Sequence, residues 1–479
     1  MTKNLELRPK QLAAIRRIVT HSAVGVFADM GAGKTAIVLH AMMILPHPVL
    51  LIGPIRVIEG VWEPEAELWQ AIKDHGFTWS LVRGTPAQRL KALAKPADVY
   101  LINPDLLHWL FTLSARVRPK FKTLVIDESS QFKDSTTRRF KALRKKLRSF
   151  EHRIILTGTP SPNGLLNLWS QIFILDRGER LEKLKTYFKA RYFMQDAWSK
   201  YKYTPVPGAY QKITERISDI VIRIKQPREF PAKHIPQYFE LNKKTRDLYD
   251  ELEAKAFADI GAGVSAPIII TKFTKLRQLT GGFIYDDDRV AQKVHEQKLD
   301  LVEEIIEETG SPVIVIYQYK HELAALQRRF PNGKKYRSDA DRVSWNRGKI
   351  DILFLYPSSG YGLNLQKGGH TIIVYSSSFS QEQMSQSFAR LDRPGQKEQV
   401  YVHWLIAKDT IDELLYTVIK TKTTNQDQLL DRIMNYAYRK RVANRKGVPL
   451  QSRTAQNSYA SRAHHARPKQ RRVDEESTA

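Results

Sequence analysis

Short apolar runs rich in valine, isoleucine and leucine alternate with helical patterns along most of this chain, and no other feature constrains the fold as strongly. Strands and helices that alternate in this way form parallel sheets covered by helices. The sequence therefore predicts an α/β fold with two parallel-sheet lobes. The expected strands are Gly25–Ala28, Val49–Ile52, Val99–Ile102, Leu124–Ile126 and Ile154–Leu156 in the first lobe, and Val313–Tyr317, Ile352–Leu355, Thr371–Tyr375 and Val400–Leu405 in the second.

The strand rhythm lapses between the two sets of runs, which divides the chain into parts. From about Leu165 to Ile224 the sequence is rich in Tyr, Lys, Arg and Trp, and we expect helices there with a proline-containing loop at Tyr203–Gly208. The resulting organisation is a first lobe at 1–166, a helical insertion and linker at 167–232, a second lobe at 233–438 with a helical protrusion near 245–295, and a basic tail at 439–479.

The C-terminal tail differs from the rest of the chain in composition. Between Arg439 and Val473 there are eleven Lys and Arg residues and no Asp or Glu. With few large apolar side chains, this segment cannot bury enough surface to offset its ordering entropy, so we expect it to be disordered alone. It is either a solubility tail or a non-specific arm that contacts phosphates.

The whole chain is strongly basic, with a formal net charge of +27. Such an excess favours a polyanionic partner, of which nucleic acid is the commonest. An anionic membrane surface is the other polyanion, but the sequence contains no basic amphipathic helix with bulky aromatic residues on its apolar face. We therefore expect a nucleic-acid partner and no membrane contact.

Composition also bears on the compartment. No run approaches the ~18 apolar residues of a membrane-spanning helix, and Met1–Lys10 lacks the apolar stretch of a secretory signal. The chain contains no cysteine, so it has neither disulfides nor thiolate metal sites. These features fit a reducing compartment, and the small size without accessory domains favours a bacterial or phage source. We therefore expect a cytoplasmic protein of a bacterium or a phage-infected cell, and a nuclear location stays open.

A glycine-containing loop follows the first expected strand. It reads Ala28-Asp29-Met30-Gly31-Ala32-Gly33-Lys34-Thr35 and precedes a helical pattern. Gly31 and Gly33 allow backbone conformations that direct successive N–H groups at phosphate oxygens, and the helix dipole adds to that field. We expect Lys34 to reach the β- and γ-phosphates of ATP and Thr35 to bind magnesium.

Two adjacent acids follow another expected strand, at Asp127 and Glu128. A buried strand that ends in two carboxylates is costly unless a cation lies near them. We expect Asp127 to bind magnesium, and Glu128 to orient and deprotonate an attacking water. The alternative is a solvated acidic turn.

Two arginines, Arg390 and Arg393, lie three residues apart on an expected helix. This spacing would place both on one face. They are either part of a charged solvent-exposed face or arginine fingers that neutralise the phosphoryl charge of a transition state. Because they belong to the second lobe, the second interpretation requires the two lobes to close on ATP.

Taken in order, these motifs resemble superfamily-two helicases, and more closely the Swi/Snf-type DNA-dependent ATPases. The resemblance runs from about Leu7 to Lys420. It rests on Leu7–Gln11, the glycine loop, Trp62–Trp69, Asp127-Glu128, Leu156–Asn163 with Leu165, Leu168 and Trp169, Leu276–Leu279, Gly360–Leu365, and Gln386–Gln396.

This resemblance implies two RecA-like lobes and site roles for individual residues. Gln11 would read adenine, Thr157 and Thr159 would relay between ATP and nucleic acid, and Gly360 and Gly362 would allow close backbone approach in the second lobe. The resemblance further implies that Gln386, Arg390 and Arg393 complete the pocket. Gly362 and Gln386 thus join Gln11, Gly31, Gly33, Lys34 and Thr35 as expected nucleotide-binding residues.

Two departures from the family pattern stand out. Ser129-Ser130 replace the Ala-His or similar pair that usually follows the acids, which leaves open how the metal site would be linked to the Thr157–Pro160 motif. Serine can still donate a hydrogen bond across a short gap. Pro357-Ser358-Ser359 replace the Ala-Gly-Gly that often precedes the late Gly-x-Gly.

The resemblance implies an ATP-dependent translocase that moves along duplex DNA. Two alternatives stay open: a strand-separating DNA or RNA helicase, and a non-catalytic DNA-binding scaffold that retains the fold. The segment Arg138–Arg148 carries seven basic residues, with Phe140, Leu143 and Leu147 at helical spacing. One face of that helix should be core, and the rest is either a solvated face or a sequence-independent phosphate contact.

Overall fold

The structure is a computed structural model of the whole chain. The chain divides into two units, Met1–Met434 and Asn435–Ala479, and every described residue except Tyr436 lies in the first. The expected basic tail at 439–479 falls outside the described residues. These are residues 6–29, 31–158, 165–195, 203–225, 231–261, 266–286, 290–360, 363–393, 395–420 and 436.

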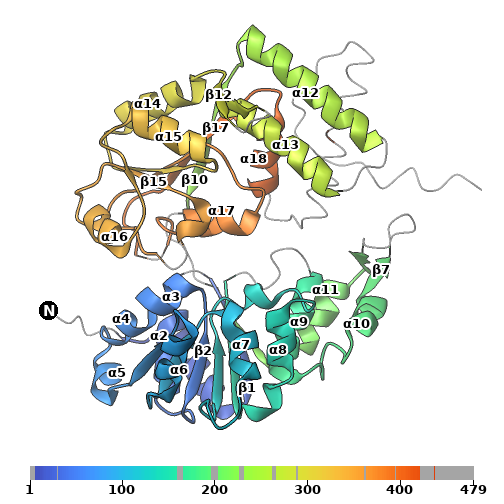
Figure 1. Ribbon diagram of the computed structural model, residues 1–479, viewed down its shortest axis with the longest axis vertical. Coiled ribbons are helices and arrows are strands. Elements are labelled where there is room, and N and C mark those ends of the chain that lie inside the picture. Colours follow the sequence, from blue (N-terminus) through green and yellow to red (C-terminus); the bar gives the residue numbers. More distant parts are fainter. Residues whose placement is uncertain are drawn as a thin grey trace, which may run out of the picture. The chain divides into compact units, whose positions relative to one another are not determined.

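The first sheet has seven strands, all parallel, in the order β3-β4-β2-β5-β6-β1-β9 (Figure 1). The strands are β1 (Ala23–Ala28), β2 (Val49–Ile52), β3 (Trp79–Val82), β4 (Val99–Ile102), β5 (Thr123–Ile126), β6 (His152–Thr157) and β9 (Val221–Ile224). The helices of this part are α1 (Pro9–Thr20), α2 (Lys34–Met42), α3 (Ile55–Gly60), α4 (Trp62–Ala66), α5 (Gln70–His75), α6 (Pro86–Ala94), α7 (Leu107–Thr112), α8 (Arg138–Arg144) and α9 (Leu168–Asp176).

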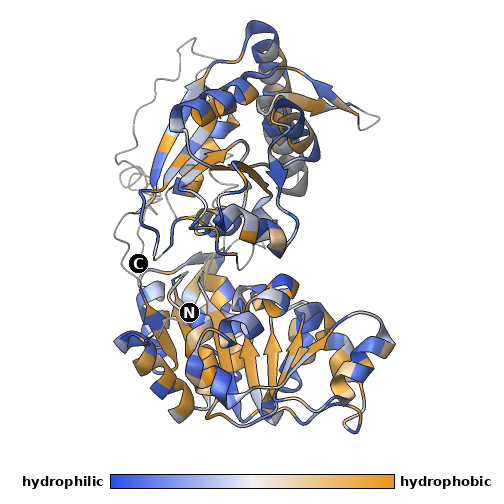
Figure 2. Cartoon of the chain, turned by 90° about the vertical axis from the view of Figure 1, so that its left-hand side faces the viewer, coloured by the Kyte–Doolittle hydropathy of each residue, from blue (hydrophilic) through white to orange (hydrophobic). Residues whose placement is uncertain are grey.

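Burial on both faces explains why these strands are short and apolar. In β2, Leu50 and Ile52 belong to one hydrophobic cluster, and Val49 and Leu51 belong to another. Alternate residues of a strand point to opposite faces, so a sheet covered on both sides requires apolar residues at every position. Figure 2 shows this as hydrophobic strands lying among helices of mixed hydropathy.

The segment after α9 is not only helical. It contains α10 (Lys185–Tyr192), the antiparallel pair β7 (Phe193–Gln195) and β8 (Tyr203–Pro205), α11 (Ala209–Arg216) and then β9. Strand β9 pairs with β1 and extends the first sheet. The prediction of helices alone is wrong here, because Arg223 interrupts the apolar run of β9 and hides it from the strand pattern. The boundaries at 166 and 232 stay predictions.

The second sheet has six parallel strands in the order β10-β17-β16-β13-β15-β14. Its strands are β10 (Lys233–Phe239), β13 (Val313–Ile316), β14 (Lys334–Lys335), β15 (Ile352–Leu355), β16 (Thr371–Val374) and β17 (Tyr401–Ala407). Its helices are α14 (Gln297–Thr309), α15 (Lys320–Arg329), α16 (Asp339–Asn346), α17 (Gln381–Phe388) and α18 (Ile411–Lys420).

Two further helices, α12 (Lys243–Gly261) and α13 (Ala266–Thr280), follow β10 and pack against each other. A short antiparallel pair, β11 (Phe283–Tyr285) and β12 (Ala291–Lys293), comes next. Tyr249 of α12 and Phe273 of α13 are fully buried in a cluster with Leu415 of α18, which joins these helices to the second sheet.

The predicted fold class is confirmed, since the chain forms two parallel sheets that are each covered by helices. Among the residues that the structure describes, no helix combines the length and apolar character that a membrane crossing requires.

Candidate active site

The glycine loop connects β1 to α2, and two of its glycines adopt left-handed backbone conformations. Gly31 has φ 77° and Gly33 has φ 80°. The positive φ of Gly33 favours glycine there, and a Cβ atom at this position would lie 2.2 Å from Nε2 of Gln11, which would have to move. That same Nε2 donates a hydrogen bond to the Ala32 carbonyl at 3.2 Å, which places Gln11 directly against the loop.

Lys34 is the first residue of α2, and its ammonium group turns back towards the end of β1. Nζ donates hydrogen bonds to the carbonyl oxygens of Ala28 at 2.7 Å and Asp29 at 3.3 Å. Burial lowers the pKa of Lys34, and the negative charges of Glu128 and Asp127 oppose that shift. Thr35 follows in the first turn of the same helix and is partly buried.

Asp127 follows β5, where the indole of Trp62 holds its carboxylate. Trp62 is fully buried in α4, and its Nε1 donates to Oδ2 of Asp127 at 3.1 Å. Burial raises the pKa of Asp127 to about 6, and the neighbouring charge of Glu128 adds to the increase. A carboxylate so destabilised by burial gains from a cation beside it.

The donor set fits magnesium. Mg²⁺ prefers hard oxygen ligands and is commonly bound by one or two protein groups together with substrate phosphates. The Asp127 carboxylate and the Thr35 hydroxyl are groups of this kind. Among the described residues no three His, Cys, Asp or Glu side chains gather as a metal site. A magnesium ion held by these two groups would take its remaining ligands from phosphate oxygens and water.

Glu128 has an unusual backbone conformation for a residue with a side chain. Its φ is 59° and its ψ is 62°, in the left-handed region where a non-glycine residue is strained by about 1–3 kcal/mol. Its Oε1 accepts two hydrogen bonds, from Ser130 Oγ at 2.9 Å and from Thr157 Oγ1 at 3.2 Å. Within the described part of the chain its other oxygen, Oε2, has no hydrogen-bond partner.

The two serines after the acids have different partners. Ser129 Oγ donates to Gln171 Oε1 of α9 at 2.8 Å, inside the first-sheet core. Ser130 Oγ contacts Glu128 and also Oε1 of Glu382, on α17, at 3.0 Å. The link from the acids to the motif that follows β6 is therefore made by Thr157 and Glu128 directly. Thr159 lies outside the described residues.

The two arginines meet at one backbone oxygen, although not on a helix. Helix α17 ends at Phe388, so the prediction that a helix carries both is wrong. Pro394 in the sequence disfavours helical backbone at Arg393, so a helix could not have continued through both arginines. Nη1 of Arg390 and of Arg393 donate to the Leu363 carbonyl at 3.3 and 3.0 Å.

Arg393 also interacts electrostatically with charged residues of the first-sheet part, Glu65 and Lys34. Burial lowers its pKa, and the carboxylate of Glu65 opposes this. The positive charge of Arg393 contributes in turn to the lowered pKa of Lys34. The structure thus brings Lys34, Asp127, Glu128 and Arg393 into one electrostatic neighbourhood, with Arg390 beside Arg393.

The remaining expected residues lie in different surroundings. Gln386 is buried on α17, where its Nε2 donates to Glu382 Oε1 at 3.4 Å. Gly360 is the last residue of a short 3₁₀ helix that begins at Pro357. Gly362 falls outside the described residues, so its expected contact with nucleotide stays a prediction.

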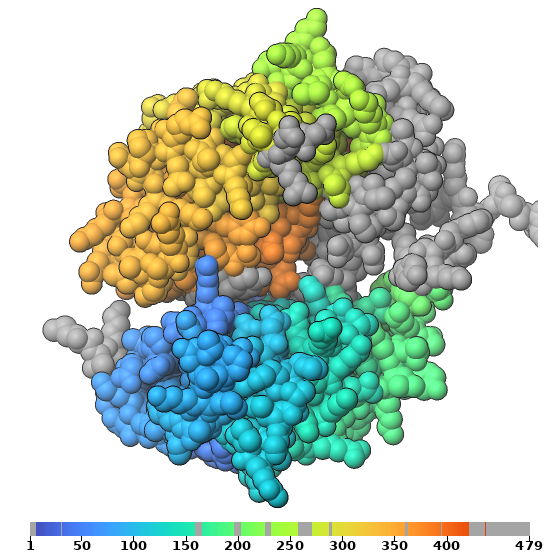
Figure 3. All heavy atoms as spheres, in the orientation of Figure 1, coloured from blue at the N-terminus to red at the C-terminus, as the bar shows by residue number. Residues whose placement is uncertain are grey.

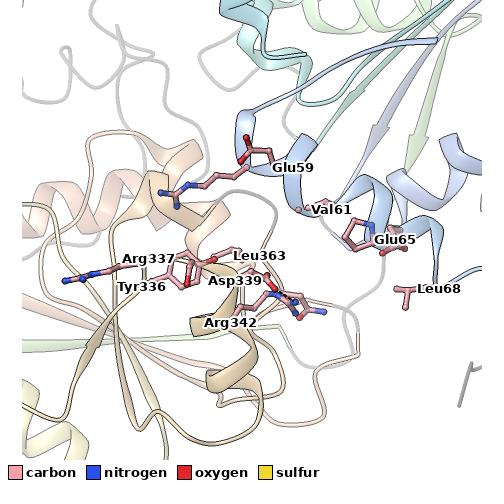
Figure 4. A pocket seen from close by; sticks show the side chains of 14 residues that line it. Glu59, Val61, Glu65, Leu68, Tyr336, Arg337, Asp339, Arg342 and Leu363 are labelled. Atoms are coloured by element: carbon pink, nitrogen blue, oxygen red, sulfur yellow. Dashed lines mark hydrogen bonds and ion pairs between the residues drawn. The ribbon is translucent and has the colours of Figure 1, made fainter. Parts of the chain in front are cut away.

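A cavity of about 660 Å³ has in its lining both Glu65 and Leu363, whose carbonyl binds the two arginines (Figure 4). Glu59, Val61, Glu65 and Leu68 line it from the α3–α4 region, and Tyr336, Arg337, Asp339, Arg342 and Leu363 line it from around α16. Figure 3 shows the surface that includes α3, in blue, next to the orange surface of the second-sheet segments. A hydrogen bond from Arg56 to the Ser359 carbonyl joins these two regions.

One face of the basic segment around α8 is apolar and buried, as predicted. Phe140, Leu143 and Leu147 are buried in the first-sheet core. Arg139 pairs with Asp105 at 3.2 Å, and the Arg144 guanidinium lies 4.8 Å from the centroid of the Phe173 ring. The expected phosphate contact of this segment stays a prediction.

Sequence reasoning missed two contributors to this site, Trp62 as a donor to Asp127 and Glu382 as a partner of Ser130. Trp62 lies in the Trp62–Trp69 segment that carried part of the family resemblance, which was a signal for the first. The position of Glu382, four residues before Gln386, gave no signal of its own.

Comparison with known proteins finds relatives in the family that the sequence motifs resemble. A family model described as the SNF2-related domain matches residues 13–279. The chain is 33% identical over 459 residues to "Putative protein p41" of Acyrthosiphon pisum secondary endosymbiont phage 1, covering 90% of this chain and 99% of that protein.

Two further similarities are more distant. The chain is 25% identical to "Putative ATP-dependent helicase/translocase YwqA" of Bacillus subtilis (strain 168), covering 84% of this chain but only 46% of that longer protein. A solved structure described as "Sulfolobus solfataricus SWI2/SNF2 ATPase core in complex with dsDNA" aligns with a TM-score of 0.41 and 19% identity over 93% of this chain and 97% of that chain. A similarity that low carries no argument about function.

Proposed function

This chain belongs to the SNF2-related family, and on that basis we propose that it is a DNA-dependent ATPase that moves along duplex DNA. The observation that carries the ATPase part is the set of charged groups around Lys34. Glu128, Asp127 and Arg393 all act on the ammonium of that one residue, although they come from segments far apart in the sequence. Such a grouping of one cation, two acids and an arginine suits the binding and cleavage of a triphosphate.

In this proposal the first-sheet residues bind the substrate. Gly31 and Gly33 direct backbone N–H groups at phosphate oxygens, and Gln11, which already contacts the loop, recognises the base. Lys34 now hydrogen-bonds to the carbonyls of Ala28 and Asp29, and on binding it exchanges them for phosphate oxygens. The lowered pKa of the buried Lys34 returns towards its ordinary value when the phosphates arrive.

Glu128 takes the role of water-activating base. Ser130 and Thr157 both occupy Oε1, which leaves Oε2 to accept a proton from the attacking water. Asp127 and Thr35 would hold magnesium, which when bound would neutralise charge on the phosphate oxygens. Arg390 and Arg393 supply positive charge towards the transferred phosphoryl group, and Gln386 supports them from α17.

The DNA partner is proposed from charge and family. A net charge of +27 favours nucleic acid, and the absence of any base-reading motif in the sequence favours sequence-independent contact with the phosphate backbone. The name of the B. subtilis relative, a putative helicase and translocase, supports motor activity of this class. We place the protein in the cytoplasm of a bacterial or phage-infected cell, in keeping with its phage relative.

An ATPase panel tests the proposal. The purified full chain is assayed with magnesium and ATP alone, and then with duplex DNA, single-stranded DNA and RNA at increasing salt. We expect the largest stimulation by duplex DNA of any sequence, with an apparent affinity that falls steeply as salt rises. If no nucleic acid stimulates hydrolysis, the proposed function is wrong, and a non-catalytic DNA-binding role takes its place.

Translocation and strand separation need their own comparison. A motor that tracks along a duplex displaces a third strand from a triplex without opening the duplex beneath it. A strand-separating helicase releases a labelled strand from a forked duplex instead. We expect ATP-dependent triplex displacement and no strand release, and strand release would identify the helicase alternative.

A further inference from the structure

Glu382, in the first turn of α17, makes contacts that the expected family roles do not explain. Its side chain is only 12% exposed. Oε1 accepts from Ser130 Oγ at 3.0 Å and from Gln386 Nε2 at 3.4 Å, and Oε2 lies 3.8 Å from Lys133 Nζ. Two of these partners, Ser130 and Lys133, belong to the segment that follows the acids at the end of β5.

Ser130 connects Glu382 to the proposed catalytic base. Its Oγ lies 2.9 Å from Oε1 of Glu128 and 3.0 Å from Oε1 of Glu382. A serine hydroxyl has a single hydrogen to donate, so it either alternates between the two acceptors or accepts a hydrogen bond from one carboxyl, when that group is protonated, while donating to the other. Only the second arrangement makes both hydrogen bonds at once, and it forms a continuous chain from α17 to Glu128.

The orientation of the Glu128 carboxylate depends on few contacts. Its backbone is held in a strained left-handed conformation, and among the described residues its side chain has two donors, Thr157 and Ser130. Thr157 is fully buried at the end of β6 in the same sheet, so its position is fixed by the sheet itself. Ser130 differs from Thr157 in that its hydroxyl also contacts Glu382 on α17.

We propose that Ser130 and Glu382 form a positioning pair, through which α17 fixes the Glu128 carboxylate in the orientation that water activation requires. The proposal rests on the ATPase function inferred above and adds two positioning residues to it. Helix α17 also leads into Arg390 and Arg393, so one helix would place both the arginines and, through Ser130, the base. The Ser130–Glu382 contact therefore couples the acids to α17, while the Thr157–Glu128 hydrogen bond links them to the Thr157–Pro160 motif.

Burial is consistent with a tightly held pair. Burial raises the pKa of Glu382, and the charge of Glu128 adds to this, while Lys133 and the Ser130 hydrogen bond oppose it. The ordinary alternative is an ion pair between Glu382 and Lys133 that only stabilises the fold. Its 3.8 Å separation is long for such a pair, and a partly exposed ion pair adds little to stability.

Single and double substitutions separate these possibilities. Ser130→Ala and Glu382→Ala should each lower kcat about 10-fold or more, as loss of an orienting partner does, with the KM for ATP unchanged. The double variant should be no slower than the slower single variant, because both changes break the same connection. Glu382→Gln, which keeps an acceptor oxygen for Ser130, should restore most of the turnover.

Lys133→Ala and Glu398→Ala are the matched controls, since the first removes the ion pair and the second removes an exposed acid in the same part of the chain. Both should keep wild-type kcat. Thermal unfolding and binding of a fluorescent ATP analogue confirm folding and ATP affinity in every variant. If Glu382→Ala does not fold, Ser130→Ala, which only removes a hydroxyl, and Glu382→Gln carry the test.

The outcomes distinguish this inference from the function on which it rests. If the wild-type protein shows no ATPase activity with any nucleic acid, the proposed function is overturned and this inference with it. If the wild type is active while Ser130→Ala and Glu382→Ala match it in kcat, only the positioning pair is overturned. Multiplying effects in the double variant, or an equal loss in Lys133→Ala, would also overturn it.

Discussion

Trp62 Nε1 donates a hydrogen bond to Asp127 Oδ2 at 3.1 Å, so a fully buried indole holds the carboxylate proposed to bind magnesium. Partners that orient a metal ligand typically contribute 10–100-fold to metal affinity. Trp62→Phe keeps the aromatic packing and removes the donor. We expect Mn²⁺, followed by electron paramagnetic resonance in the presence of nucleotide, to bind about 10–100-fold more weakly to this variant.

The control for this change is a second tryptophan of the same segment. Trp69 Nε1 donates to Glu65 Oε1 at 3.3 Å and has no contact with Asp127 among the hydrogen bonds of the described residues. Trp69→Phe should therefore leave Mn²⁺ affinity unchanged. Equal affinities in Trp62→Phe and wild type would show that the indole only packs.

Lys34 and Glu128 should fail at different steps. Lys34→Ala removes the only side-chain ammonium proposed to contact the phosphates, so we expect weak binding of a fluorescent ATP analogue. Glu128→Gln keeps the size of the side chain and an oxygen for Ser130 and Thr157 but removes the base. It should bind the analogue as wild type does and hydrolyse ATP about 10²–10⁴-fold more slowly. Wild-type turnover in Glu128→Gln would remove this residue from catalysis.

The two arginines share the Leu363 carbonyl, and the positive charge of Arg393 acts on Lys34. We expect Arg393→Ala to lower kcat about 10³-fold or more, as loss of an arginine finger does, while ATP binding changes only a few-fold. Arg342→Ala is a suitable control because Arg342 lines the nearby cavity and pairs with Asp339. A similar loss in that control would point to a general effect of removing positive charge.

The sequence anticipated the strands that are buried on both faces. Val49–Ile52 and Val99–Ile102 have the expected bounds, because every position of these strands is covered and the apolar run is unbroken. Strands β3 and β9 were not anticipated, since Ser80 and Arg223 interrupt their runs. Ser80 donates to the Ala92 carbonyl of α6, a tertiary contact that no local pattern reveals.

The candidate site was anticipated to a similar extent and for a related reason. Residues that follow a strand, such as Lys34 and Asp127, could be placed together because the carboxyl ends of parallel strands meet at one edge of a sheet. The contacts of Trp62 and Glu382 could not, because they depend on how a helix packs across the strand ends. The end of α17 before Arg390 was also missed, since helix boundaries depend on a few local contacts.

His321, at the start of α15, should make the stability of the protein sensitive to acid. It is 7% exposed and lies among Tyr319, Phe283 and Tyr285, with ring centroids 5.0–5.3 Å away. Within the described part of the chain neither ring nitrogen has a hydrogen-bond partner, and burial lowers its pKa to about 4. Between that value and the ~6.5 of an unfolded histidine, only the unfolded chain binds the proton.

The sign of the effect follows from this difference. Stability supplied by neutral His321 is fully present above pH 6.5 and is lost as the pH falls towards 4, amounting to about 1–2 kcal/mol at pH 5. His321→Phe keeps an aromatic ring without a titrating group, so its melting temperature should fall less between pH 7.5 and pH 5 than that of the wild type. His108→Phe, at an exposed position on α7, should keep the wild-type pH dependence. If His321→Phe and the wild type lose equal stability over this range, protonation of His321 does not drive the acid sensitivity, and the buried His295, whose pKa is also lowered to about 4, becomes the group to replace.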